Sequence, residues 1–386
     1  MDNRSLHSLM VYLFFAYSTM TIIASYLPVF YQSQGLTGAQ VGMLMAIGPF
    51  ATILAQPLWG YWSDKYKSIR RMLLIALVGF IISVTVFLFV NAFAGYFIMM
   101  FILFIFLSPI TALGDSLSQK TAIKYRISFG RIRMWGSIGF AVTSLITGYI
   151  LTWIGVENIM LPVLFMAVIA LLVAFAIHDV PGVNKPVTVL SALRLGANPN
   201  LILFLICVTL ISVTHRANDT YLGIYIVELG GPEAMIGWAW FIGVTAEALV
   251  FATSYRWFKN WSPLTFVMIA ALIYAGRWFL MGLLTNPWFI LPLQLTHGLS
   301  FGLFYIASFH YVSKLVPEHL QATGHVLFIT TFFGLSGIIG SLFGGYMIET
   351  AHLSTFYVVL GICALVGAVS LMIYKRFVHL NSEMFL

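Results

Sequence analysis

The chain has 386 residues, of which 61% are hydrophobic and only 8% are charged, and its mean hydropathy is +0.97. Soluble globular domains carry about 25% charged residues, so this composition excludes a water-soluble fold and indicates an integral membrane protein. The net charge of +7 does not indicate a nucleic-acid partner, because the basic residues lie at the ends of apolar segments and form no continuous basic face.

Twelve apolar segments are long enough to cross a hydrocarbon layer of about 30 Å as helices. In chain order they are residues 10–31, 38–60, 71–90, 95–120, 131–152, 158–178, 200–227, 234–254, 263–283, 287–312, 322–347 and 354–374. The longest polar break separates the sixth span from the seventh. We therefore expect an all-α membrane fold with a six-helix bundle at residues 1–180, a cytoplasmic linker at 181–199 and a second six-helix bundle at 200–386.

The two halves of the chain repeat each other. Residues 27–42 (LPVFYQSQGLTGAQVG) align without a gap with residues 222–237 (LGIYIVELGGPEAMIG), at an offset of 195. One residue before this segment, Tyr26 matches Tyr221. A duplicated half inside a very apolar chain is typical of transporters built from two parallel repeats, with the substrate path between them.

The distribution of positive charge predicts the orientation. If both chain ends are cytoplasmic, every Lys and Arg except Arg216 and Arg277 falls on a cytoplasmic segment or an adjoining helix end. Cytoplasmic segments of membrane proteins are rich in Lys and Arg. The pattern therefore predicts a multi-pass protein of the cell (plasma or inner) membrane with both termini in the cytoplasm.

The loop between the second and third spans carries a motif, GYWSDKYKSIRR at residues 60–71. It resembles the G-x-x-x-D-[RK] signature of the major facilitator superfamily, although the usual second glycine is absent. The resemblance implies a gating turn that contains Gly60, Asp64, Lys65 and Arg70. Gly60 would let helices approach and Asp64 would cap a helix or pair with a cation. The alternative is an ordinary basic loop.

Ionisable residues inside the spans are energetically costly, so each one is either functional or part of a structural pair that holds helices together. They are Asp115, Arg133, His215, Arg216, Asp219, Glu247, Arg277, His297 and His310. Residues 129–136 (FGRIRMWG) resemble the F-G-R-x-R-M-x-G segment of the lactose permeases. There an acidic residue 18 positions earlier pairs with the second arginine and binds substrate, which corresponds here to Asp115 and Arg133.

The resemblance extends into the second half of the chain. Glu247, Arg277 and His297 fall where the lactose permeases have a sugar-binding glutamate, an arginine and a histidine. Three residues after the histidine, the lactose permeases carry the proton on a glutamate, and here that residue is Ser300. A serine does not exchange a proton near neutral pH, so Glu247, Asp115 or His297 would have to carry it.

A closer resemblance, over most of the chain, is to the phenylpropionate permease group of the same superfamily, and the residues that carry it include Ser108-Pro109, residues 133–137, His215 and residues 276–278. This resemblance implies a secondary active transporter that moves a small organic solute (an organic acid, a sugar or a nucleoside-like compound) by alternating access, in symport with a proton. The expected substrate ligands are Asp115, Arg133, Tyr26, Tyr221 and Glu247, and the expected proton-coupling residues are Glu247, Arg277 and His297.

The sequence has no P-loop, metal-ligand cluster or nucleophile motif, so we expect no cofactor, no metal and no enzymatic activity. The expected partners are the solute, a proton and the lipid bilayer, with the chain acting as a monomer. Two alternatives remain open. A proton-driven exporter of drugs or metabolites would favour a broad apolar cavity with a single acidic residue. A non-transporting membrane receptor or scaffold would have little use for so many charges inside its spans.

Overall fold

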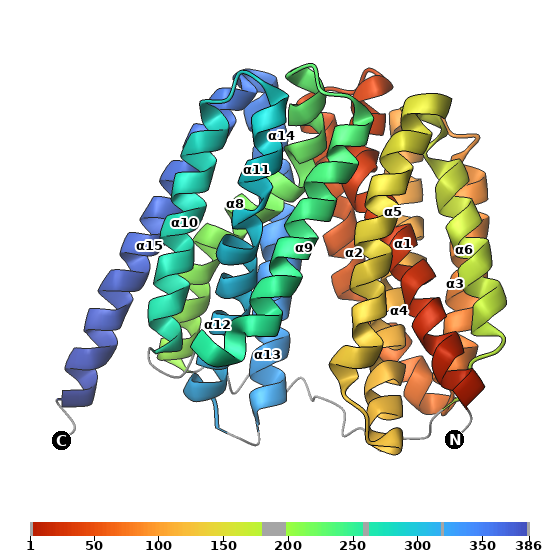
Figure 1. Cartoon of the computed structure of the whole chain (residues 1–386), viewed down its shortest axis with the longest axis horizontal. Coiled ribbons are helices and arrows are strands. Elements are labelled where there is room, and N and C mark those ends of the chain that lie inside the picture. The colour runs from red at the N-terminus through yellow and green to blue at the C-terminus, as the bar shows by residue number, and fades with distance from the viewer. Residues whose placement is uncertain (1–2, 180–197, 258–261, 318–319, 384–386) are drawn as a thin grey trace. The chain divides into compact units, whose positions relative to one another are not determined.

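The structure is a computed structural model that describes residues 3–179, 198–257, 262–317 and 320–383. All regular elements in these ranges are helical (Figure 1). The α-helices are α1 (Asn3–Ser33), α2 (Gly38–Lys65), α3 (Ile69–Phe87), α4 (Phe93–Tyr125), α5 (Phe129–Ile154), α6 (Met160–Ala174), α8 (Pro199–Glu228), α9 (Glu233–Trp257), α10 (Pro263–Gly282), α11 (Ile290–Gln294), α12 (Leu303–Leu315), α13 (Gln321–Ile329), α14 (Ser336–Thr350) and α15 (Leu353–Glu383).

Among the described residues, 12 helical segments are long and apolar enough to cross a membrane, which confirms the predicted number and order of spans. Two of these segments are composite. The tenth span, Pro287–Leu315, joins α11 to α12 through a π-helical turn at Gly298–Gly302. The eleventh, Thr323–Thr350, joins α13 to α14 through a π-helical turn at Thr330–Leu335. π-Helical turns inside α-helices are frequent at functional sites.

The sequence repeat is a repeat of local structure. Helix α1 ends at Ser33 and α8 ends at Glu228, the same offset of 195 residues that aligns the two sequences. Gly35 and Gly230, two residues further on, have φ angles of +78° and +84°. Glycine adopts this left-handed conformation without strain, and it commonly ends a helix. The two matched glycines therefore make equivalent turns at the ends of equivalent spans.

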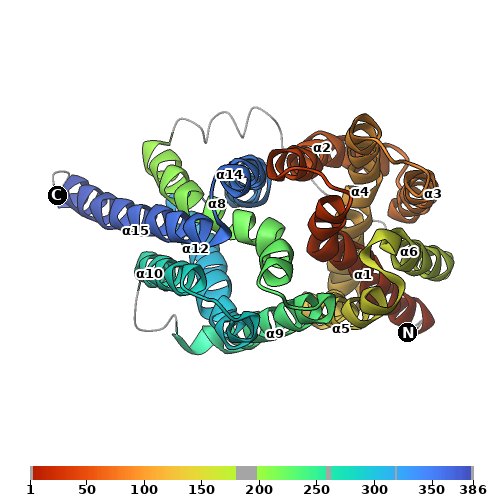
Figure 2. The ribbon, with the colours of Figure 1, turned by 90° about the horizontal axis from the view of Figure 1, so that it is seen from above.

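The chain folds into two compact units. The first unit is Met1–Asn184 with Leu222–Phe241, and the second is Lys185–Tyr221 with Ile242–Leu386. In the first unit α1 packs against α4, α5 and α6, and α4 also packs against α2 and α3. In the second unit α10 packs against α12 and α15, and the three helices are seen side by side in Figure 2.

Each unit contains a glycine at which two helices touch. An added Cβ on Gly139 of α5 would collide with the backbone of Phe14 in α1. An added Cβ on Gly340 of α14 would lie 2.8 Å from the carbonyl oxygen of Val213 in α8. Small residues permit such close crossings between membrane helices. The first span of each unit is therefore pressed against a glycine-bearing partner helix.

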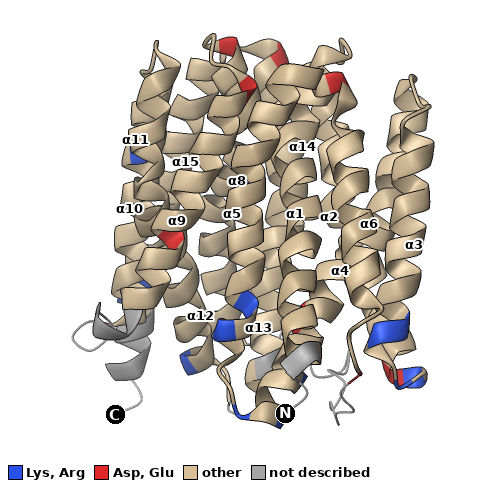
Figure 3. Ribbon diagram, turned by 45° about the vertical axis from the view of Figure 1, so that its right-hand side comes forward, with Lys and Arg blue, Asp and Glu red and all other residues tan. Residues whose placement is uncertain are grey.

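The charged residues at the helix ends are segregated. Within each unit, Lys and Arg lie mainly at one end of the helices, and most Asp and Glu of the connecting turns lie at the other, although some acidic residues accompany the basic ones, as Figure 3 shows. This segregation is the pattern on which the predicted orientation rests.

Candidate functional site

The charged cluster of the first unit joins three helices. Arg133 of α5 forms an ion pair with Asp115 of α4, and its Nε lies 3.0 Å from Asp115 Oδ1. Tyr17 of α1 donates a hydrogen bond from its OH to Asp115 Oδ2 at 2.7 Å, and its ring centre lies 3.9 Å from the guanidinium carbon of Arg133. The predicted pairing of Asp115 with Arg133 is thus confirmed. Their side chains are 33% and 28% exposed, so the pair is not sealed inside the helices.

The structure shows why residues 129–136, the segment that contains Arg133, end with a glycine at Gly136. An added Cβ at Gly136 would lie 2.6 Å from Tyr17 Cδ2 and 2.8 Å from Arg133 Nη1. The missing side chain therefore makes the room in which the tyrosine ring and the guanidinium stack. Tyr17 itself was not predicted, because the contact joins residues 98 positions apart and no local pattern distinguishes this tyrosine from the others.

Arg277 is the centre of a buried polar network in the second unit. Its side chain lies on α10 and donates to residues of span ten: Nη2 donates to Gln294 Oε1 at 2.7 Å and Nη1 donates to Ser300 Oγ at 3.2 Å. Nη1 also lies 3.2 Å from His297 Nδ1. Arg277 is only 2% exposed, and its guanidinium carbon lies 4.8 Å from the ring centre of Trp278. The guanidinium is therefore solvated by side chains of the protein in place of water.

His297 lies between Arg277 and Glu247. Its Nδ1 contacts the arginine, and its Nε2 lies 3.8 Å from Glu247 Oε2 of α9. The helices touch here because Gly298 has no side chain, and a Cβ at that position would collide with the carbonyl of Ala246. The three residues predicted to act together in the second half are therefore brought together, with the imidazole as the connecting group.

A third charged cluster lies on α8. Arg216 Nη1 donates to Asp219 Oδ2 at 2.8 Å, and His215 Nε2 lies 3.3 Å from the same oxygen. The His215 and His297 rings are 5.6 Å apart, so this cluster adjoins the Arg277 network. The sequence identified Arg216 and Asp219 as ionisable residues inside a span but offered no reason to assign them a role. Their i and i+3 spacing was the available signal, since residues at this spacing share a helix face.

Tyr26 and Tyr221, predicted as substrate ligands, are packing residues in this structure. Both are 0% exposed. Tyr26 OH donates to the carbonyl of Ser144 in α5 at 2.6 Å, and Tyr221 OH donates to the carbonyl of Ser341 in α14 at 2.6 Å. The matched tyrosines of the repeat therefore make matched helix contacts. Because neither ring is accessible, we do not retain them as substrate ligands.

The loop between α2 and α3 departs in part from its expected role. An added Cβ at Gly60 would have no neighbour within 4 Å among the described residues, so the interpretation that Gly60 permits a close helix approach is wrong for this structure. Asp64 has no ion pair with any described residue. The Nζ of Lys65 lies 5.8 Å from the ring centre of Tyr61.

Arg70 and Asp179, a residue that no sequence pattern indicated, join this loop to the end of α6. Arg70 Nη2 donates to the carbonyl of Phe175 at 2.6 Å. Asp179 accepts hydrogen bonds from the backbone N–H of Arg70 at 2.8 Å and from the hydroxyl of Ser68 at 2.5 Å. A carboxylate at this place stabilises the start of α3, because it satisfies a free N–H group and favours the positive end of the helix dipole.

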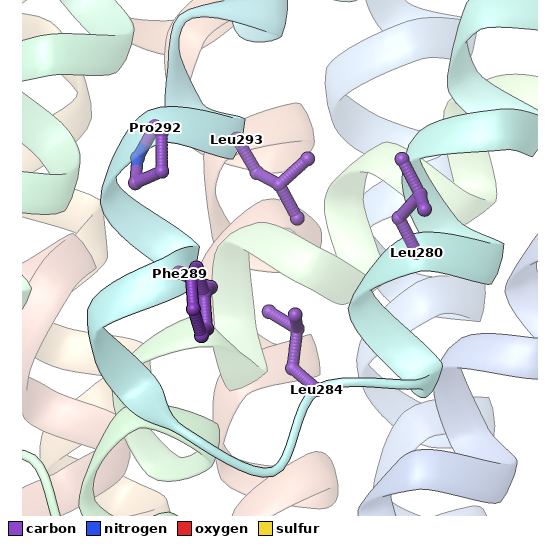
Figure 4. Close-up of a pocket in the computed structure, with 5 residues that line it drawn as sticks. All are labelled: Leu280, Leu284, Phe289, Pro292 and Leu293. Carbon is purple, nitrogen blue, oxygen red and sulfur yellow. The ribbon is translucent and has the colours of Figure 1, made fainter.

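The structure also has an apolar cavity of about 300 Å³, lined by Leu280, Leu284, Phe289, Pro292 and Leu293 (Figure 4). Leu280 is 51% exposed and Phe289 is 60% exposed. None of these five lining side chains is polar, so they offer no group that would orient a solute. We therefore assign no solute site to this cavity.

Twelve spans that hold several clusters of charged side chains define a polytopic membrane transporter. The chain belongs to the MFS_1 like family, whose model matches residues 6–359. The resemblance to major facilitator permeases is thus confirmed. The chain is a transporter and not an enzyme.

The relatives include permeases of different solutes. The chain is 30% identical to a maltose permease of Geobacillus stearothermophilus, over 94% of this chain and 92% of the relative. It is 27% identical to a probable 3-phenylpropionic acid transporter of Escherichia coli (strain K12), over 89% of this chain and 91% of the relative. Among solved structures, the nucleoside transporter NupG is similar with a TM-score of 0.87 at 17% identity, over 97% of this chain and 100% of that chain. This structural likeness shows the shared fold.

Proposed function

We propose that this chain is a secondary active transporter that moves a neutral, hydroxyl-rich small solute, such as a sugar, together with a proton. The observation that carries the proposal is the Asp115–Arg133 pair, in which a donor fork and a carboxylate acceptor lie side by side. An anionic solute would have to compete with Asp115 for Arg133 and would be repelled by the aspartate. A hydroxyl group both donates and accepts, so it suits a paired aspartate and arginine.

The individual roles follow from the contacts. Arg133 donates to solute hydroxyl groups, while Asp115 and Tyr17 hold its guanidinium in place. Glu247, which is 21% exposed, accepts hydrogen bonds from the solute. His297 and Arg277 position Glu247, because the imidazole lies between the two side chains. The similarity to a maltose permease over nearly the whole chain supports a sugar as the first solute to test.

The charged clusters argue against the two alternatives considered from the sequence. An exporter of apolar compounds needs an open apolar cavity with one acidic residue, whereas the spans here hold Arg133, Arg216 and Arg277 with polar or charged partners. A scaffold has no use for such residues, since each charge inside a span destabilises the protein unless it is paired.

Transport by purified protein in proteoliposomes tests the proposal. Accumulation of maltose, uridine and 3-phenylpropionate would be measured with an imposed inward proton gradient, with and without a protonophore. We expect gradient-driven accumulation of maltose that the protonophore abolishes. Accumulation of only 3-phenylpropionate would contradict the neutral solute, and accumulation that survives the protonophore would contradict proton coupling. No flux of any of the three would contradict the proposed function.

We also propose that both termini are cytoplasmic, since all loop Lys and Arg then lie on the cytoplasmic side. The loop with Asp64, Lys65 and Arg70 is cytoplasmic in this orientation, and Arg70 carries the gating contact to the end of α6. A reporter fused after Leu386 is expected to read as cytoplasmic, and an external reading would contradict the orientation.

A further inference from the structure

Asp219 is a buried carboxylate that has no part in the roles proposed so far. Its side chain is 12% exposed, and both of its side-chain partners contact the same oxygen, Oδ2. The other oxygen, Oδ1, is buried and has no hydrogen-bond partner among the described residues. A carboxylate that remains ionised inside a protein normally has both oxygens satisfied. An oxygen without a partner is a position where a proton is readily accommodated.

Asp219 is surrounded by charged groups and lies next to His215, whose ring is packed against an aromatic residue. The groups that act electrostatically on its carboxylate from other helices are Arg277 and Tyr274 of α10 and His297 of span ten. On its own helix, the ring of His215 is stacked on Phe301, with centres 4.5 Å apart and planes within 4°. Water is therefore largely excluded from one side of the carboxylate, while Arg216, at 26% exposure, remains partly accessible.

We propose that Asp219 is the carboxyl group that carries the coupled proton, and that its protonation releases Arg216 to donate hydrogen bonds to the solute. This inference rests on the proposed symport function. Arg216 makes one direct carboxylate contact, through Nη1, and its Nε has no hydrogen-bond partner among the described residues. Once Asp219 is neutral, the charge attraction that holds the guanidinium is lost. The solute hydroxyl group then replaces the carboxylate as the acceptor.

The same assignment explains how transport proceeds with a serine at position 300. Ser300 is 0% exposed, and its hydroxyl donates to the carbonyl of Thr296 at 2.9 Å and accepts from Arg277. It is therefore a structural hydroxyl group. Asp219 contacts His215, whose ring lies 5.6 Å from that of His297, so the proton-carrying carboxyl adjoins the same polar network but lies on a different helix.

The other two carboxyl groups inside the spans are less suited to this role. Asp115 accepts a hydrogen bond from Tyr17 at Oδ2, and its Oδ1, which has no hydrogen bond among the described residues, has an ion-pair contact with Arg133. Glu247 is more exposed than Asp219, 21% against 12%, so it is the more accessible of the two to a solute. Protonation of Asp115 would loosen the positioned Arg133, and protonation of Glu247 would weaken an acceptor of the solute, whereas protonation of Asp219 releases a further donor to the solute.

The coupling predicts a definite pH dependence. At high pH the ionised Asp219 holds Arg216 and solute binding is weak. As the pH falls, Asp219 binds a proton, Arg216 is released and solute binding strengthens. Asp219→Asn mimics the protonated state permanently, so its solute affinity is expected to be high and independent of pH.

Proteoliposomes that contain the full chain and one solute test the proposal. The solute is whichever of maltose and uridine, both of which carry hydroxyl groups, the wild-type protein accumulates. At one proton per solute, a gradient of one pH unit drives about tenfold accumulation by the wild-type protein. Asp219→Asn is expected to accumulate nothing above equilibrium and to retain solute exchange. Thr209→Val is the matched control, because the Thr209 hydroxyl donates to the Leu205 carbonyl of its own helix, and it should accumulate like the wild type.

The outcomes separate the two proposals. Gradient-driven accumulation by Asp219→Asn, with a normal wild type, overturns the role of Asp219 and leaves the proposed function intact. No gradient-driven accumulation by the wild type overturns both. Loss of both accumulation and exchange by folded Asp219→Asn also overturns the proton-carrier role, because it makes Asp219 a residue required for every transport step.

A second measurement does not depend on the folding of Asp219→Asn. Infrared difference spectra between high and low pH would be recorded on protein labelled with carbon-13 at the aspartate carboxyl group, in an Asp115→Glu background. This background removes the other aspartate described away from the ends of the spans, and the spectrum of Asp115→Glu with Asp219→Asn is the control for aspartates at the helix ends. We expect the carbonyl band of the protonated carboxyl group to shift with the aspartate label. A band that shifts only with labelled glutamate would overturn the assignment.

Discussion

The two aspartate–arginine pairs of this transporter differ in how the carboxylate is used. Asp115 takes Arg133 at one oxygen and the Tyr17 hydroxyl at the other, from two different helices. Asp219 takes both of its partners at a single oxygen, and both come from its own helix. The first pair is held across three helices, and Asp115 Oδ1 has the ion-pair contact with Arg133, although it has no hydrogen bond among the described residues. The second pair is local, and Asp219 Oδ1 has neither an ion pair nor a hydrogen bond among the described residues.

This difference suits the two arginines to different roles: Arg133 stays in a fixed position, whereas Arg216 changes its partner when Asp219 is protonated. Arg133 is fixed by an ion pair and by its contact with the Tyr17 ring, so its planar fork stays in one orientation. A fixed fork suits repeated binding of the same solute groups. Arg216 contacts its carboxylate through Nη1, and its guanidinium carbon is 5.7 Å from the Phe333 ring centre, against 3.9 Å for Arg133 and Tyr17. Because this ring contact is looser, we expect the loss of the charge on Asp219 to release Arg216. Substitutions at the two pairs and around them can break or sharpen this contrast.

Replacement of either arginine by lysine should give the largest difference between the pairs. Arg133→Lys keeps the charge but loses the planar fork that contacts both Asp115 and the Tyr17 ring, and we expect solute affinity to fall by roughly a hundredfold, or about 3 kcal/mol. Arg216→Lys keeps a point charge and should lose about fivefold or less. Solute affinity and uptake would be compared at matched amounts of protein, with Arg131→Lys as the control on an exposed residue of the same helix as Arg133. Equal losses by the two variants would show that the pairs do not differ in this way.

Gly136 gives a smaller and more local test of the positioned pair. The methyl group of Gly136→Ala would lie 2.6 Å from Tyr17 Cδ2 and 2.8 Å from Arg133 Nη1. The ring or the guanidinium must shift, so we expect solute affinity to fall by about tenfold, a loss of about 1.4 kcal/mol. Gly130→Ala is the control, because its nearest neighbour, Ser128 Oγ, is at an ordinary contact distance of 3.6 Å.

Both glycines lie in α5, where alanine favours the helix over glycine. The amount of folded protein should therefore not fall in the control. Unchanged solute affinity in Gly136→Ala would mean that the stacking of Tyr17 on Arg133 has no part in binding.

Composition and the resemblance to a known family made part of the structure predictable. Apolar length predicted the spans, and the resemblance of residues 129–136 to the lactose permease segment implied the pairing of Asp115 with Arg133. Contacts that depend on helix packing were not predictable. Tyr17 reaches Asp115 across 98 residues, and Asp179 reaches Ser68 across 111, with no local pattern for either.

The contacts of the matched tyrosines Tyr26 and Tyr221 were also not predictable from the sequence. Substitutions at these tyrosines give the smallest effect that we predict. The repeat identified Tyr26 and Tyr221 as equivalent, but only the structure shows that each OH donates to a carbonyl of the facing helix. Tyr26→Phe and Tyr221→Phe each lose one buried hydrogen bond, which should lower the free energy of unfolding by about 1 kcal/mol. Thermal unfolding in detergent would measure this loss of stability. Solute affinity should stay within about twofold of the wild type, because a contact distant from the solute is expected to change the binding free energy by less than about 0.4 kcal/mol. A large loss of affinity with normal stability would return these tyrosines to the solute site. An equal, small decrease in stability from both variants would instead confirm that the repeat conserves a packing contact in each unit.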